Sequence, residues 1–190
     1  FRSVQDIGTG TYTIIAQVVS SLTGIALDNI EVELGNSSFP PAPVSGGSWA
    51  TASVLPAIAE ATRQAIDQLK AFSTAPKGVF AGSKPDQVSF EQGQIKSGEK
   101  SFAIADVLKA QKQSSAFGEA KTGMNDTSKH SFRSFGVHFV EVRWDPGISR
   151  LRVARVVSAI DVGKVINHKT SLNQVEGAIV MGVGMALFEA

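Results

Sequence analysis

The chain has no cysteine among its 190 residues, and its charges nearly cancel, with 18 Lys and Arg against 17 Asp and Glu. The lack of cysteine excludes a disulfide scaffold, a cysteine-ligated zinc or iron–sulfur centre and a thiol nucleophile. The net charge of +1 leaves no electrostatic signature for a nucleic-acid partner. With 43% apolar residues, the chain is instead rich enough to build one real core, in one domain or two.

Long hydrophobic runs are also missing. The longest strongly apolar stretch, Gly177–Phe188, is shorter than the roughly 20 residues of a membrane-spanning helix, so we expect no membrane segment. No basic segment followed by an apolar one marks a signal peptide at the start. The chain begins at Phe1 rather than Met and ends at Ala190 within an apolar, helix-like run, which predicts a piece of a longer protein.

Apolar residues at helical spacing predict four helices, at residues 11–22, 52–72, 102–111 and 167–190. Gly24 follows the first as a C-terminal cap signal, and Pro56 lies near the start of the second, where proline does least harm. Polar, glycine- and proline-rich stretches predict loops at residues 36–47 and 113–130.

Alternating patterns predict strands at residues 30–34, 88–90 and 94–102, the last turning at Ser97-Gly98. Residues 135–144 and 151–161, joined by Asp145-Pro146-Gly147, predict an antiparallel hairpin with a bulge near Arg155. The expected fold class is α+β, a mixed sheet with an antiparallel hairpin and packed helices. We expect one region over residues 1–190, with a subdivision near 76–130 as the alternative.

The segment Asp6-Ile7-Gly8-Thr9-Gly10 comes directly before the first predicted helix. Its glycines permit positive φ, and a helix start presents unpaired N–H groups and the positive end of the dipole. This arrangement suits a phosphate or another polar, anionic group, whereas the plainer interpretation is an ordinary glycine turn. It is not the dinucleotide-binding fingerprint, because the third glycine is missing.

A second glycine-rich segment, residues 45–53, leads into the second predicted helix. Its four hydroxyl side chains exceed what capping a helix requires, although a capped helix is the plainer interpretation. They belong to Ser45, Ser48, Thr51 and Ser53. Two such helix starts in one chain would suit a ligand with several polar or phosphate groups.

The last predicted helix contains Gly177, Gly182 and Gly184. Because glycine inside a helix costs about 1 kcal/mol relative to alanine, these predict close approach by another backbone or by a flat ligand. Gln174 on the same helix can both donate and accept hydrogen bonds, as recognition of a heterocycle edge requires. Spacing alone favours the alternative of tight helix packing. The three histidines are dispersed along the sequence, so we expect no histidine metal site.

These motifs, in this order, resemble the molybdenum-binding subunit of the xanthine dehydrogenase and aldehyde oxidase family over nearly the whole chain. The matching segments are residues 6–10, 45–53, 134–142, 161–167 and 174–184. The resemblance implies a molybdenum cofactor, a molybdopterin that bacterial relatives usually carry as a cytosine dinucleotide. The residues that it assigns to cofactor binding are Ile7, Gly8, Thr9, Gly10, Gly47, Ser48, Thr51, Ala52, Ser53 and Gln174.

In the resemblance, the first segment contacts the dithiolene region and the phosphate, the second binds the pterin and its phosphate, and Gln174 bonds the pterin. Thr9 departs from the glutamine that many relatives have close to a ligand on the metal, and its reach is shorter. The family's general-base glutamate follows the helix with which this chain ends, and neither Glu176 nor Glu189 matches it. We therefore predict that this polypeptide alone is inactive.

The resemblance also implies an iron–sulfur subunit and an FAD subunit as partners, and a small aldehyde or heterocycle as substrate. It favours the bacterial cytoplasm slightly over the periplasm. Two other functions stay open: a non-catalytic ligand-binding or assembly module that uses the two glycine-rich helix starts, and an unrelated nucleotide-binding domain.

Overall fold

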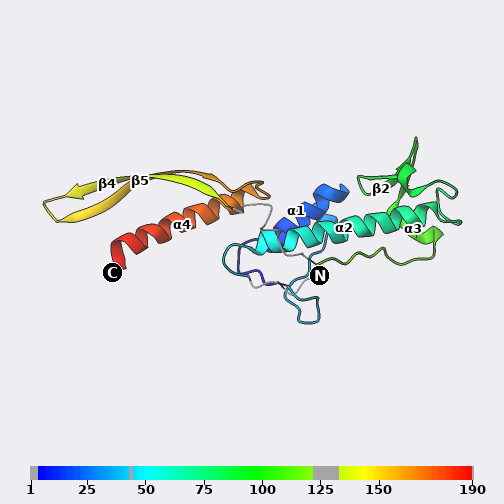
Figure 1. Cartoon of the computed structure of the whole chain (residues 1–190), viewed down its shortest axis with the longest axis horizontal. Helices are drawn as coiled ribbons and strands as arrows, with labels where there is room; N and C mark the ends of the chain where they lie inside the picture. Colours follow the sequence, from blue (N-terminus) through cyan, green and yellow to red (C-terminus); the bar gives the residue numbers. More distant parts are fainter. Residues whose placement is uncertain (1–3, 43–44, 122–132, 190) are drawn as a thin grey trace. The chain divides into compact units, whose positions relative to one another are not determined.

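The structure is a computed structural model that describes residues 4–42, 45–121 and 133–189. The chain divides into two compact units, Phe1–Gly123 and Met124–Ala190, which we describe one at a time. Helices and antiparallel strands alternate along it (Figure 1). The α+β class predicted from the sequence is therefore confirmed.

The first unit begins with helix α1, Thr11–Thr23, which agrees with the predicted helix to within one residue. Gly24 caps its C-terminus with a left-handed φ of 67°, as the sequence predicts. Ile14 and Ile15 bury the apolar face. A short 3-10 turn, η1 (Leu27–Asn29), follows.

The predicted strand at residues 30–34 does not form in the described part of the chain, where only Leu34 makes an isolated bridge. Its alternation is nevertheless visible, since both glutamates are exposed while the apolar residues between them are half-buried. A strand forms only beside a hydrogen-bonded neighbour, and among the described residues such pairing of this segment is confined to the bridge at Leu34. The predicted alternation of exposure is therefore present, but it does not extend into a paired strand within the described residues.

Helix α2, Ala50–Thr74, is the longest helix of this unit and packs against α1. Pro56 lies inside it, in the second turn, as the sequence predicts. Most of the predicted stripe faces the interior: Val54, Ala57 and Leu69 are buried, and Ile58, Ala61, Ala65 and Ile66 are half-buried.

A small antiparallel sheet follows α2 and the 3-10 turn η2 (Pro85–Gln87), in the order β1-β2-β3. Its strands are β1 (Ser89–Glu91), β2 (Gln94–Ser97) and β3 (Lys100–Ala103), with the predicted turn after Ser97. Helix α3, Ile104–Ala110, leaves the sheet directly from β3. This part of the chain confirms the predicted strands and the small helix.

The core of the first unit lies where this sheet, α2 and α3 meet. Ile95 of β2 and Val107 of α3 are fully buried against Leu69 of α2. The rings of Phe80 and Phe102 meet edge to face, with centroids 5.2 Å apart, an arrangement that aromatic pairs prefer.

Beyond α3, the chain returns along α2 in an extended segment, residues 113–121 (Figure 1). The backbone N–H of Phe117 donates to Gln68 Oε1 at 2.6 Å, and that of Glu119 donates to Gln64 Oε1 at 3.1 Å. The two glutamines are one helical turn apart on α2 and so present their oxygens on one face. Gly118, between the two donors, lies directly on the backbone of α2.

The second unit is built on a long hairpin of β4 (Phe135–Asp145) and β5 (Arg150–Asp161). Glu141 pairs with Arg155 while Val142 pairs with Val153, so Ala154 is an extra residue and forms a bulge. The predicted hairpin and its bulge near Arg155 are confirmed.

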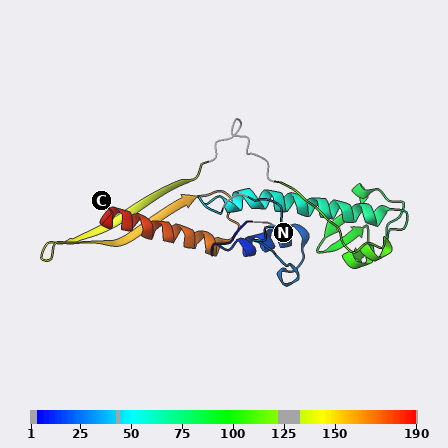
Figure 2. The same ribbon diagram turned by 90° about the horizontal axis from the view of Figure 1, so that it is seen from below.

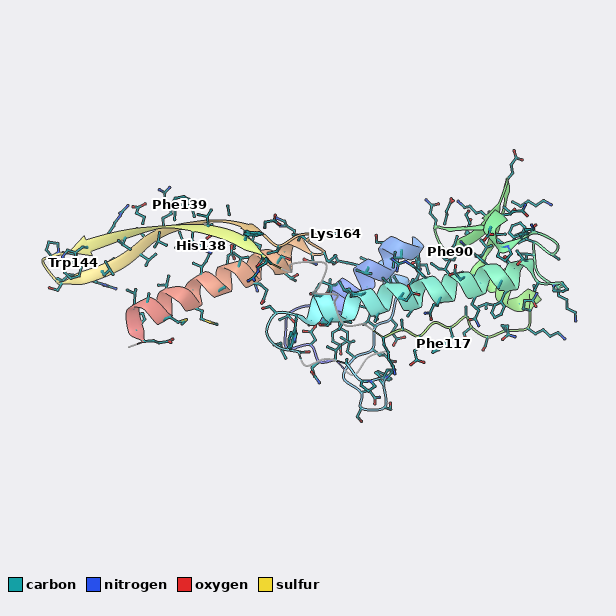
Figure 3. All side chains as sticks on the ribbon, in the orientation of Figure 1. Phe90, Phe117, His138, Phe139, Trp144 and Lys164 are labelled. Carbon is teal, nitrogen blue, oxygen red and sulfur yellow. The ribbon has the colours of Figure 1, made fainter. Side chains whose placement is uncertain are left out.

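The bulge keeps the apolar residues of the two strands in phase. Val153 and Val156 are three residues apart, so in a regular strand their side chains would lie on opposite faces of β5. With the extra residue between them, they pair with Val142 and Val140, which share one face of β4. Figure 3 shows Trp144 near the hairpin tip and Phe139 further back along the strand. Both side chains are exposed, Trp144 at 59% and Phe139 at 67%.

Helix α4, His168–Phe188, follows the hairpin and begins where Asn167 accepts the N–H of Thr170 in a side-chain cap, 3.0 Å long. Among the described residues of α4, none is buried. By length and composition alone α4 is apolar enough to span a membrane, a test that core helices of soluble proteins also pass. The described chain covers the apolar residues of α4 only in part, since Val175, Ile179 and Val183 are half-buried whereas Val180, Met181 and Met185 are exposed.

Candidate functional site

The first glycine-rich loop is organised by the Asp6 carboxylate. Asp6 Oδ1 accepts the N–H of Gly8 at 2.8 Å, of Thr9 at 2.9 Å and of Gly10 at 3.4 Å. Asp6 Oδ2 accepts the N–H of Tyr12, in the first turn of α1, at 3.5 Å. The glycines have φ of 95° at Gly8 and 83° at Gly10, so the positive φ predicted for them is confirmed.

These hydrogen bonds favour the ionised form of the Asp6 carboxyl group. Partial burial raises the pKa of the Asp6 carboxyl, but the N–H groups of Gly8, Tyr12, Gly10 and Thr9 together hold that pKa below its ordinary value of 3.8. Asp6 is therefore a carboxylate at neutral pH. The α1 start is therefore less suited to an anion than the sequence suggests, because a carboxylate of the chain itself accepts the N–H of Tyr12 and those of the loop residues before the helix.

The second glycine-rich loop leads into α2 with a different geometry. Gly47 and Ser48 both have φ of 58°, and left-handed backbone is uncommon for a residue with a side chain. The first intrahelical bond runs from Ser53 N–H to the Trp49 carbonyl, and the Trp49 side chain makes no capping hydrogen bond. The N–H groups of residues 50–52 thus have no acceptor within the helix and face outward.

The structure brings these two loops together. Ser45 Oγ, from the second loop, donates to the Gln5 carbonyl next to Asp6 at 2.6 Å. The views in Figures 1 and 2 both show α1 and α2 beginning close to one another. The site predicted in two distant parts of the sequence is therefore one place in the first unit.

The predicted residues of this place differ in exposure. Side chains that reach solvent surround the two helix starts, and Ile7 at 70% and Trp49 at 55% add apolar surface to the polar groups. Ser53 is half-buried. The exposed predicted residues are Ile7, Gly8, Thr9, Gly47, Ser48, Thr51 and Ala52.

Gln174 lies in α4 of the second unit and is exposed. At Gly177, Gly182 and Gly184 an added Cβ would meet no atom within 4 Å in the described structure. The close backbone approach predicted from these glycines is not made by any other segment among the described residues. The helix instead presents a smooth, open surface that a flat ligand or another segment can approach.

Sequence reasoning missed Asp6, Ser45 as the link between the loops, and the exposed Trp49. A signal for Asp6 was present, because Asp two residues before glycine is typical of a side chain that accepts nearby backbone N–H groups. No group of three or more His, Asp or Glu gathers within the described ranges. The donors present, amides and hydroxyls around an open helix start, fit a phosphate-bearing organic cofactor better than a bare metal ion.

The fold is α+β, and it brings two glycine-rich helix starts together in its first unit. The chain belongs to the family of the molybdopterin cofactor-binding domain, whose sequence model matches residues 1–190. The predicted resemblance to the molybdenum-binding large subunit of the xanthine dehydrogenase and aldehyde oxidase family is therefore confirmed.

Two curated relatives are similar to this chain in sequence, and one solved structure is similar to it in fold. The chain is 32% identical over 185 residues to the aldehyde oxidoreductase molybdenum-binding subunit PaoC of Escherichia coli K12, covering 97% of the chain and 24% of the relative. It is 31% identical over 192 residues to the nicotine 6-hydroxylase large subunit of Paenarthrobacter nicotinovorans, covering 96% and 23%.

The fold is similar to that of quinoline 2-oxidoreductase from Pseudomonas putida 86. The TM-score is 0.80 at 17% identity, and the likeness covers 95% of this chain and 24% of the other. The chain thus spans about a quarter of the length of the relatives it matches.

Proposed function

We propose that this chain forms part of the cofactor-binding wall of a molybdenum hydroxylase, an oxidoreductase acting on a small aldehyde or N-heterocycle. The observation that carries the proposal is the open N-terminus of α2, tied to the Asp6 loop by the Ser45–Gln5 hydrogen bond. Its support is the family match over the whole chain and a relative that is the molybdenum-binding subunit of an aldehyde oxidoreductase.

The α2 start is the place for the cofactor phosphate. Backbone N–H groups of residues 50–52 and the hydroxyls of Ser48, Thr51 and Ser53 supply donors, and the helix dipole favours negative charge there. The small residues Gly47 and Ala52 let a ligand come close to the backbone. Exposed Trp49 offers a flat apolar surface beside them.

The remaining predicted residues have roles that do not need a negative ligand group. Ile7, Gly8, Thr9 and Gly10 would border the pterin end of the cofactor, and the Gln174 amide would hydrogen-bond the pterin edge. The bound group supplies the molybdenum at which the substrate is hydroxylated. We propose the cytosine dinucleotide form, which would add a second phosphate and a base.

The chain carries no residue that we assign to catalysis. Glu176 lies within α4 and Glu189 at its C-terminal cap, whereas the general base of the family that this chain resembles follows the helix, so neither residue matches it. Because the chain also has no cysteine, it cannot ligate an iron–sulfur cluster through thiolates, and we propose that electrons leave through other segments of the parent or through its iron–sulfur and FAD subunits. The polypeptide alone is therefore proposed to be inactive.

The test is the metal and pterin content of the full-length parent, purified with its partner subunits. We expect molybdenum and an extractable pterin in equal amounts. Thr51→Val, which removes one hydroxyl at the α2 start, should lower the content several-fold. Thr74→Val, the same change at the other end of α2, is the matched control and should leave it unchanged. A wild-type complex without molybdenum and pterin would contradict the proposal and favour a non-catalytic assembly module.

A further inference from the structure

The starts of α1 and α2 lie together but differ in charge. At the α1 start, one carboxylate accepts four backbone N–H groups, those of Gly8, Thr9, Gly10 and Tyr12. At the α2 start, the N-cap side chain makes no capping bond. Two helix starts that look equally suited to an anion in the sequence are therefore unequal in the structure.

The arrangement at Asp6 has two physical effects. Its hydrogen bonds span residues 8–12, so a single side chain fixes the shape of a loop that contains two residues of left-handed φ, Gly8 and Gly10. Its negative charge and its use of the donors also make the loop unfavourable for a second anion. An added Cβ at Gly8 would meet nothing within 4 Å, so the outer side of this fixed loop is open.

We propose that Asp6 is a positioning residue for the cofactor: its hydrogen bonds hold residues 7–10 in their ligand-facing shape, and its negative charge disfavours a phosphate group at the α1 start. The inference rests on the proposed function. The loop then meets its ligand through side chains, chiefly those of Ile7 and Thr9, and not through the N–H groups of residues 8–10.

Three variants of the parent complex test this inference. Asp6→Ala removes both oxygens and should lower the molybdenum and pterin content per folded protein at least five-fold. Asp6→Asn keeps one oxygen for the N–H groups of residues 8–10 but replaces the acceptor of Tyr12 with a donor. It should restore the content to at least half that of the wild type. Asp28→Ala, an exposed acidic residue in η1, is the control and should match the wild type.

Amide hydrogen exchange of a peptide covering residues 5–13 separates positioning from general destabilisation. In Asp6→Asn, the N–H of Tyr12 should exchange faster while Gly8 and Thr9 stay protected, and the rest of α1 should be unchanged. If Asp6→Ala does not assemble, this pattern and the cofactor content of Asp6→Asn decide the matter.

Full cofactor content in a folded Asp6→Ala complex overturns the inference while the proposed function stands. The same holds if Tyr12 exchange in Asp6→Asn equals that of the wild type. A wild-type complex without the cofactor overturns the proposed function itself, and the two failures are thereby distinguishable.

Discussion

Replacing Gly118 by alanine should detach the segment of residues 113–121 from α2. A Cβ at this position would lie 2.9 Å from the Ala61 carbonyl carbon and 3.0 Å from the Ala65 nitrogen, and closer still to the Ala61 carbonyl oxygen. All three atoms belong to the backbone of a 25-residue helix and cannot move aside without breaking helical hydrogen bonds. The extended segment must therefore yield.

The cost follows from the contacts on either side of Gly118. Detachment breaks the bonds from Phe117 N–H to Gln68 and from Glu119 N–H to Gln64. At about 1 kcal/mol for each, their loss removes about 2 kcal/mol, or a factor of about 30 in protection of these amides. Hydrogen exchange with mass spectrometry on a peptide covering residues 113–121 measures this directly.

The control is Ser115→Ala, an exposed position in the same segment, which should leave exchange unchanged. The double variant Gln64→Ala, Gln68→Ala should speed exchange as Gly118→Ala does, by removing the acceptors instead of the space. Wild-type exchange in Gly118→Ala would refute the reasoning, since it would show that the close backbone contact does not hold the segment.

Two further predictions concern stability. Ile95→Ala empties a fully buried position in the core of the first unit, and it should destabilise that unit by about 3 kcal/mol, seen as a lower midpoint in urea, whereas the exposed Lys100→Ala should not. Because the folded-state pKa of Asp6 lies below its unfolded value near 3.8, the carboxylate stabilises the fold fully above that pH and loses this effect as the pH falls through the folded-state pKa. The melting temperature of the wild type should thus exceed that of Asp6→Asn at pH 6, with a gap that shrinks below pH 3.8; a gap independent of pH would contradict this.

Local signals explain what the sequence predicted well. Gly24 and Asn167 mark helix ends because cap geometry depends on a few neighbouring residues. The slip in alternation near Arg155 predicted the bulge, because the pleat of a strand has a fixed period. The candidate loops were likewise found from glycines and hydroxyl residues next to helical patterns.

The failures have physical reasons of the opposite kind. Residues 30–34 show a strand pattern, but a strand also needs a neighbour, which no local pattern reveals. The contacts of Gln64 and Gln68 join positions 55 and 49 residues apart, and only the fold brings them together. At Asp6, the sequence analysis identified N–H donors for a ligand anion but overlooked that the nearby Asp6 carboxylate can accept from the same donors.

The placement of apolar side chains along β4 has a consequence for any structure that covers the hairpin. Phe135, Val137 and Phe139 lie on one side of β4, and Val140, Val142 and Trp144 lie on the other, because alternation along this strand is unbroken. One face of the hairpin is thus apolar over the first half of β4, and the opposite face is apolar over the second half. A layer packed on one face can bury only half of these side chains. Burying all of them requires packing on both faces of the hairpin.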